Sequence, residues 1–378
     1  MENQIKERVL ISFLGKGDYQ QINYQLNGRT YESCLALLPI KEEFKPDKVY
    51  IIGTEESKWN LLTSFEYERV IIPSGRSNEE FWEILDILAD RLQLNDKLVA
   101  FDITHCFRSI PIFVMIFIKF LKFTEKNTDI LHIYYGILET KQIIDIRPLI
   151  DLLEWIEAVS LFCKHGDLDG LSELVEKADR EIRHSSPGPQ KLLLRDLKNN
   201  LKDLSAIAKM TYVPQFGEIA RAISDLLSDT RLQDEAKIYL KPLFFLLPDL
   251  LNMINRFKAR SEWEAQLKIA RWYLEKNNPS QALLVLREAI ITHQCITMNK
   301  DPYQNEIRRQ IEQELGVAVL QKVKAPIYQL WDKVSQTRNK SAHALMRRKE
   351  NIDPVKALNR VKALIEEAER IMSEEKQN

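Results

Sequence analysis

The sequence predicts an α/β fold over residues 1–150 and an all-α fold over the rest of its 378 residues. Short apolar runs alternate with helical patterns in the first part, and from Pro148 onward the pattern is helical almost throughout. The apolar runs have no polar face, which is typical of a mostly parallel sheet that helices cover on both sides. This length corresponds to roughly two to three domains. We therefore expect a domain at 1–150, a helical connector at 151–260 and a helical domain at 261–378.

Four apolar runs are expected to form the parallel strands, and each is followed by a turn of small or polar residues. These runs are residues 9–14, 48–52, 70–72 and 98–103. A helix with one apolar face is expected between the third and fourth strands, with Asn78 as its N-cap. Two further runs, 131–138 and 141–146, are typical of an antiparallel hairpin.

The turns that follow the four strands form the candidate ligand site. In sheets of this kind, ligands bind outside the carboxyl ends of the strands. Any one turn has a simpler explanation, because Gly, Ser and Thr commonly end strands. Four turns at one edge, with Lys16, Arg76 and Arg108 among them, favour a ligand that carries phosphate. The candidate ligand-binding residues are Gly15, Lys16, Gly17, Asp18, Tyr19, Gly53, Thr54, Ser74, Gly75, Arg76, Thr104, His105 and Arg108.

Two features limit this interpretation of the sheet edge. The sequence has neither of the glycine-rich motifs of ordinary ATP and dinucleotide sites, so those ligands are not indicated. Asp102 lies near the end of a buried strand, close to His105 and Arg108, and the three together resemble an active site. Because of its place in the strand, we expect Asp102 to brace the turn rather than to transfer protons.

The composition excludes several other classes of protein. A net charge of −1 gives no basic field, so any nucleic-acid site must be local. The four cysteines show no C-x-x-C spacing, which argues against a zinc site or a disulfide framework and fits a reducing cytoplasm. The N-terminus is too polar for a signal peptide, and the apolar stretch 111–123 is well short of the ~20 residues of a membrane helix. We therefore expect a cytoplasmic protein with no metal and no membrane contact.

A second group of residues, Arg338, Asn339 and His343, is the candidate catalytic site. Cleavage of RNA without a metal requires a cation that stabilises the charge on phosphorus and a group that exchanges protons with the reacting oxygens. Arg338 and His343 would supply these functions. In a helix they lie about 140° apart, so Arg338 would act from the preceding turn or a second subunit would complete the site. The simpler explanation is a helix surface with a solvent-facing histidine.

Taken together, the two groups resemble one family. Asp102-x-Thr104-His105-x-Phe107-Arg108-x-x-Pro111 resembles the strand-four motif of CRISPR-associated Rossmann-fold (CARF) sensor domains of type III systems, and residues 15–19 match the first ligand loop of that branch. Arg338-Asn339-x-x-x-His343 resembles the site of HEPN ribonucleases, which follow the CARF domain on the same chain. Residues 265–297 look like the first HEPN helices. The connector at 151–260 matches only loosely.

The resemblance implies a Rossmann-like sensor domain and a homodimer that binds one cyclic oligoadenylate made by the type III effector complex, with cyclic tetra-adenylate favoured. Binding would activate a metal-free site, built from Arg338, Asn339 and His343 of two HEPN domains, that cleaves single-stranded RNA. The expected products carry a 2′,3′-cyclic phosphate and a 5′-hydroxyl. No cofactor is implied. The alternative is a sensor without its own nuclease, which binds the ligand and also degrades it if Thr104, His105 and Lys16 catalyse that reaction.

Overall fold

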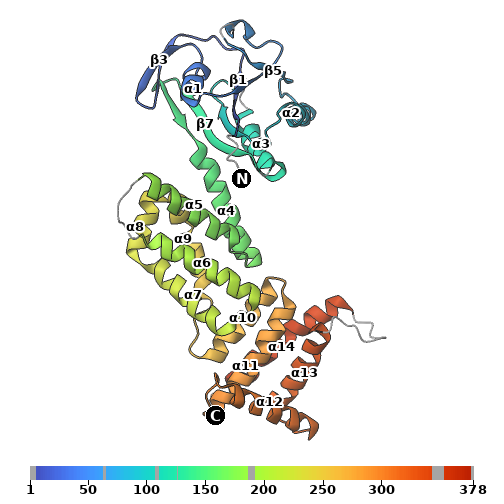
Figure 1. Ribbon diagram of the computed structural model, residues 1–378. Helices are drawn as coiled ribbons and strands as arrows, with labels where there is room; N and C mark the ends of the chain where they lie inside the picture. Colours follow the sequence, from blue (N-terminus) through green and yellow to red (C-terminus); the bar gives the residue numbers. More distant parts are fainter. Residues whose placement is uncertain are drawn as a thin grey trace. The chain divides into compact units, whose positions relative to one another are not determined.

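The computed structural model describes residues 6–62, 65–106, 110–125, 127–185, 192–342 and 353–375 (Figure 1). The chain divides into two compact units, Met1–Leu153 and Glu154–Asn378. The first is built on a mostly parallel sheet and the second consists of helices, which confirms the predicted α/β and all-α fold class.

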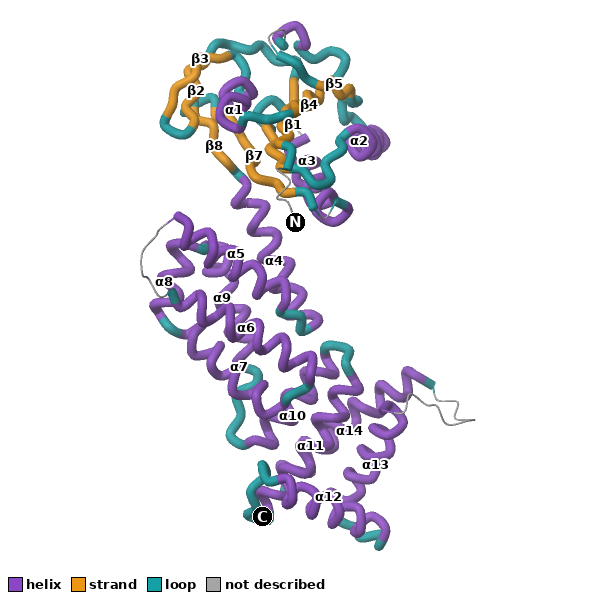
Figure 2. The backbone as a smooth tube through the Cα atoms, in the orientation of Figure 1, coloured by secondary structure: helices purple, strands orange, loops and turns teal. Residues whose placement is uncertain are grey.

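The described part of the first unit contains an eight-stranded sheet in the order β3-β2-β8-β7-β6-β1-β4-β5 (Figure 2). The strands are β1 Arg8–Leu14, β2 Ile22–Leu26, β3 Arg29–Ser33, β4 Lys48–Gly53, β5 Glu68–Ile71, β6 Leu98–Asp102, β7 Asp129–Ile137 and β8 Gln142–Asp145. Neighbouring strands from β5 to β7 are parallel, and β7 and β8 form the predicted antiparallel hairpin.

Helices lie on both faces of this sheet because its central strands are buried on both faces. Alternate side chains of a strand point to opposite sides. Ile11 of β1 belongs to a core that it shares with α2 (Asn78–Arg91) and α3 (Ile110–Thr124). Leu10 belongs to a second core that it shares with α1 (Leu37–Phe44). Three of the four predicted parallel strands, β1, β4 and β6, therefore have a strand on each side, and the fourth, β5, lies at the edge of the sheet.

Two details of the first unit differ from the predictions. The β2–β3 hairpin was not expected: its short strands are mostly polar or exposed and lie at the edge of the sheet. The N-cap of α2 is Ser77 rather than Asn78, and its side chain accepts a hydrogen bond from the backbone N–H of Glu80 at 3.3 Å.

The second unit is helical, and α4 enters it from the first unit. The helices are α4 Arg147–His165, α5 Asp169–Ser185, α6 Leu193–Met210, α7 Val213–Ser228, α8 Thr230–Tyr239, α9 Lys241–Asn255, α10 Glu262–Glu275, α11 Pro279–Thr297, α12 Asn305–Leu320, α13 Pro326–Ala342 and α14 Pro354–Glu374. One hydrophobic core extends from Trp155 to Met372. The boundary expected near residue 260, between a helical connector and a helical domain, stays a prediction. Aromatic rings on either side of it are in contact, since the centroids of Phe257 and Trp272 lie 5.7 Å apart.

Candidate functional site

The loops that follow β1, β4 and β6 meet at the carboxyl edge of the sheet, because β1 lies between the other two strands. The carbonyl of Gly15 accepts a hydrogen bond from the backbone N–H of Lys58 at 3.2 Å. A Cβ atom at Gly15 would lie 3.0 Å from the carbonyl oxygen of His105. Glycine is therefore needed at this position so that the first and fourth predicted turns can approach each other.

Asp102 braces this edge, as the sequence predicted. The residue is 0% exposed and lies opposite Ser12 in the register of β1 and β6. Its carboxylate accepts hydrogen bonds from Ser12 Oγ at 2.7 Å and from the backbone N–H of Thr104 at 3.0 Å. One carboxylate thus joins two strands and fixes the first residue of the turn.

His105 is held as a neutral imidazole beside Tyr19. Their rings meet edge-on with centroids 4.7 Å apart. Burial lowers the pKa of His105, and the charge of Asp102 opposes this only in part. The Nε2 atom lies 3.5 Å from the backbone nitrogen of Ala36, which places the ring proton on Nδ1. A neutral His105 offers a ligand one hydrogen bond but no positive charge.

Tyr19 and Thr104 are both fixed by backbone groups. The hydroxyl of Tyr19 accepts a hydrogen bond from the N–H of Gly15 at 2.8 Å, and burial raises the pKa of Tyr19 to about 12. The Thr104 hydroxyl accepts a hydrogen bond from the N–H of Gly136 in β7 at 2.9 Å. Each hydroxyl therefore retains its proton for a second acceptor.

Positive charge at this edge comes from the loops after β1 and β5. Lys16 forms an ion pair with Glu56, in the loop after β4. The hydrogen bond from Lys16 lowers the pKa of Glu56, and the charge of Arg76 contributes. Glu56 is a residue that the sequence reasoning missed. The sequence contains a signal for Glu56: Glu55 and Glu56 follow a strand end that was predicted to lie at the same edge of the sheet as Lys16.

The remaining predicted ligand residues are less closely joined. Thr54 is 4% exposed, and its carbonyl accepts a hydrogen bond from Trp59 Nε1 at 2.9 Å, so its backbone holds the loop after β4. A Cβ atom at Gly53 would lie 2.8 Å from Ser57 Oγ. Gly17, Asp18, Ser74 and Gly75 lie in the turns after β1 and β5, without a described contact to His105. Arg108 lies outside the described residues.

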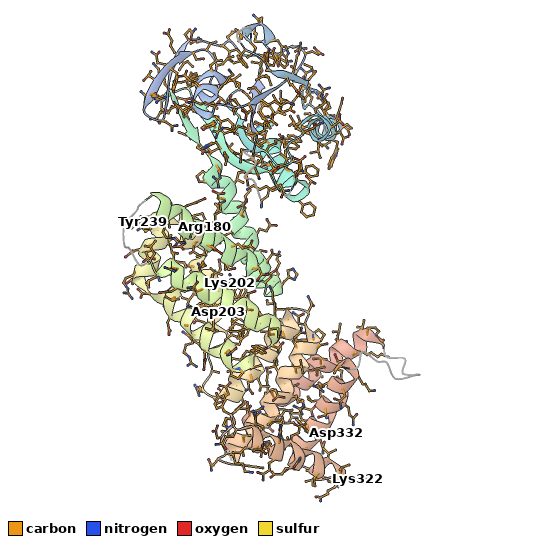
Figure 3. The ribbon with its side chains drawn as sticks, in the orientation of Figure 1. Arg180, Lys202, Asp203, Tyr239, Lys322 and Asp332 are labelled. Carbon is orange, nitrogen blue, oxygen red and sulfur yellow. The ribbon has the colours of Figure 1, made fainter. Side chains whose placement is uncertain are left out.

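The second predicted site lies near the end of α13. Arg338 is half-buried; its Nη1 donates to Asn339 Oδ1 at 3.3 Å, and its Nε is buried without a hydrogen-bond partner. Asp332, the acidic residue of this helix, accepts hydrogen bonds from Gln336 Nε2 at 2.9 Å (Figure 3). Within the described part of the chain, Arg338 has no ion pair, and its guanidinium charge is not neutralised. His343 lies outside the described residues.

Glu288 of α11 forms two ion pairs. Its carboxylate lies 2.5 Å from Arg308 Nη2 and 2.7 Å from Arg287 Nη1. Arg287 also lies over the ring of Trp331, 5.2 Å from its centroid. These contacts join α11, α12 and α13, the helix that carries Arg338.

The described residues contain no group of three or more His, Cys, Asp or Glu that could hold a metal ion. Within the same residues, no helix is both long and apolar enough to cross a bilayer. The chain thus combines an α/β unit, whose strand ends carry Lys16 and Arg76, with a helical unit in which Arg338 has no ion pair to a described residue.

Comparison with known proteins connects the chain with CRISPR-associated proteins. Residues 151–262 match the family model described as the second domain of CRISPR-associated protein MJ1674. The chain is 25% identical over 367 residues to CRISPR-associated protein MJ1674 of Methanocaldococcus jannaschii, a match that covers 77% of this chain and 54% of the relative. The chain thus spans about half the length of this curated relative. The similarity supports a CRISPR-related role and specifies neither an activity nor a ligand.

Proposed function

We propose that the protein is a cyclic oligoadenylate-activated endoribonuclease that cleaves single-stranded RNA without a metal in type III CRISPR antiviral defence. The observation that carries this proposal is the state of Arg338. Its guanidinium has no carboxylate partner among the described residues, and its Nε has no hydrogen-bond partner. Arg308, by contrast, is neutralised by Glu288. A half-buried, unpaired guanidinium is suited to an anion that arrives with the substrate.

In this mechanism, Arg338 stabilises the negative charge that develops on the non-bridging oxygens during attack by the 2′-hydroxyl. Asn339 accepts a hydrogen bond from Arg338 and thereby limits the positions of the guanidinium. His343 takes the proton of the 2′-hydroxyl or gives one to the leaving 5′-oxygen. The products are a 2′,3′-cyclic phosphate and a 5′-hydroxyl, and a homodimer supplies two copies of each residue to one site.

The sheet edge of the first unit supports the sensor half of the proposal. A cyclic oligoadenylate presents phosphates and adenine rings, and two copies of the edge would bind it symmetrically across a two-fold axis. Lys16 and Arg76 supply charge, while Thr104, His105 and Tyr19 retain hydrogen-bond donors. Cyclic tetra-adenylate is the favoured activator.

The test is cleavage of a labelled single-stranded RNA with cyclic tri-, tetra- or hexa-adenylate and with chelator present. One of the three cyclic oligoadenylates should start cleavage. Arg338→Ala and His343→Ala should each reduce the cleavage rate by about 10²-fold or more, while dimer formation and ligand binding persist. Arg309→Ala is the matched control, since Arg309 is an exposed arginine paired with Glu306 at 3.6 Å. Full activity in Arg338→Ala would overturn the proposal. Ligand binding without cleavage by any ring would establish the alternative, a sensor without a nuclease.

A further inference from the structure

The described part of the second unit has a cavity of about 620 Å³ where the start of α11, the end of α13 and the start of α14 meet. Its floor is apolar and includes Leu283, which is 2% exposed, and Val361, which is 4% exposed. Ser280 Oγ and Ser341 Oγ, 2.7 Å apart, join the ends of α11 and α13 beside it. Cavities of this volume hold small molecules or single groups of a polymer.

The charge around this cavity is of one sign. Lys340, Lys356 and Arg360 line it, and none of the lining residues that the structure describes is acidic. Lys356 and Arg360 are exposed and form no ion pair within the described ranges. The whole chain carries a net charge of −1, so two neighbouring cations without an ion pair among the described residues are a local feature rather than a property of the surface in general. They favour an anionic ligand.

We infer that this cavity binds one nucleotide of the RNA strand, with the base on the apolar floor and the adjoining phosphates against Lys356 and Arg360. Single-stranded RNA combines base faces with a charged backbone, and protein sites for it combine apolar or guanidinium surfaces with cations. Binding of a peptide or of a second copy of the chain does not require that the described residues around the cavity lack carboxylates. The inference rests on the proposed function and adds a binding subsite for the substrate.

The position of the cavity connects it with the candidate catalytic site. Thr337 and Lys340 line the cavity and flank Arg338 and Asn339 on α13. A nucleotide seated there would hold the strand beside the end of this helix, one or more positions from the phosphate that Arg338 contacts. The subsite would therefore contribute to substrate affinity and to base preference rather than to the chemical step.

The test measures binding rather than cleavage. A fluorescein-labelled, fully 2′-O-methylated RNA, which lacks the attacking hydroxyl, is titrated with the full chain in the presence of cyclic tetra-adenylate. Lys356→Ala/Arg360→Ala should weaken binding about tenfold and reduce the salt dependence by about 1.4 logarithmic units per decade, the value for two lost phosphate contacts on a single strand. Lys362→Ala/Arg370→Ala is the control, because it removes the same charge from the same helix outside the cavity.

A second measurement covers the case in which the double variant misfolds. RNA containing 4-thiouridine is photocrosslinked to the wild-type chain, and crosslinks are expected in residues 279–283 or 353–361. Equal affinity of the cavity and control variants, failure of the wild-type chain to bind this RNA, crosslinks confined to other segments, or a change of dimer stability in place of RNA affinity would each overturn the inference. Normal RNA binding by the cavity variant together with loss of cleavage in Arg338→Ala would reject the subsite and leave the proposed nuclease intact.

Discussion

The side chains of Lys16 and Glu56 form an ion pair that joins the loop after β1 to the loop after β4. Glu56 is well exposed, so water competes with this contact and a ligand can replace it. The lysine is therefore already oriented across the sheet edge before an anionic ligand arrives. An anionic ligand that binds through Lys16 would compete with the carboxylate of Glu56.

Substituting Glu56→Gln should raise the affinity for cyclic tetra-adenylate about 2- to 5-fold, because the ligand no longer displaces a competing exposed charge. Titration calorimetry measures this. Glu55→Gln is the control. Glu55 lies beside Glu56 on the same loop and is paired with Arg69 of β5 at 3.3 Å. Equal affinity in both variants would show that Lys16 does not contact the ligand.

Substituting Ser12→Ala should lower the free energy of opening of β1 and β6 by about 1–3 kcal/mol, because one oxygen of the buried Asp102 carboxylate loses its partner. Hydrogen-exchange mass spectrometry of peptides from both strands measures the change. A loss below about 0.5 kcal/mol, the size of an ordinary surface effect, would contradict the bracing role of Asp102.

His105 should make the first unit less stable in acid. Burial lowers its pKa in the folded state below the ordinary value, so the unfolded chain binds the proton more readily. This contribution to stability is present above the unfolded pKa and is lost as the pH falls through the folded pKa. His105→Gln should therefore flatten the pH dependence of hydrogen exchange in β6 on the acid side. Burial also lowers the pKa of His293. His293→Gln should therefore change the pH dependence of hydrogen exchange in α11 and leave that of β6 unchanged.

Gly166→Ala should destabilise the second unit by about 2–4 kcal/mol, since it adds both backbone strain and overpacking. Gly166 has a φ of 75°, and a Cβ atom there would lie 2.5 Å from Trp272 Cζ2. Gly170→Ala is the control, because its Cβ would meet only Ala158 Cβ at 3.7 Å and helix propensity should stabilise α5 by up to about 1 kcal/mol. Urea unfolding followed by tryptophan fluorescence distinguishes them, and equal midpoints would contradict the packing argument.

The central strands could be predicted because burial on both faces leaves an unbroken apolar run, as in β1 and β4. The edge hairpin could not, because β2 and β3 mix polar and apolar residues and join the sheet only where β2 pairs with β8. The sheet-edge residues followed from strand ends, whereas Glu56 required knowledge of which loop Lys16 faces.

The candidate catalytic residues could be proposed from one short stretch because Arg338 and Asn339 are neighbours on one helix. The adjoining cavity could not, since Leu283, Lys340 and Arg360 come from three helices whose packing the sequence pattern does not specify. A cation such as Arg360 has no distinguishing mark in the sequence. Its significance depends on the absence of carboxylates from the described residues that line the cavity with it.

The docking of β2 against β8 also sets an order of events during synthesis. Gln25 pairs with Gln142, and its N–H donates to the carbonyl of Lys141 at 2.7 Å. At about 5–20 residues per second, a ribosome needs on the order of ten seconds to make the chain between them. During that time β2 has an unpaired strand edge, which exposes the nascent chain to pairing with other strands.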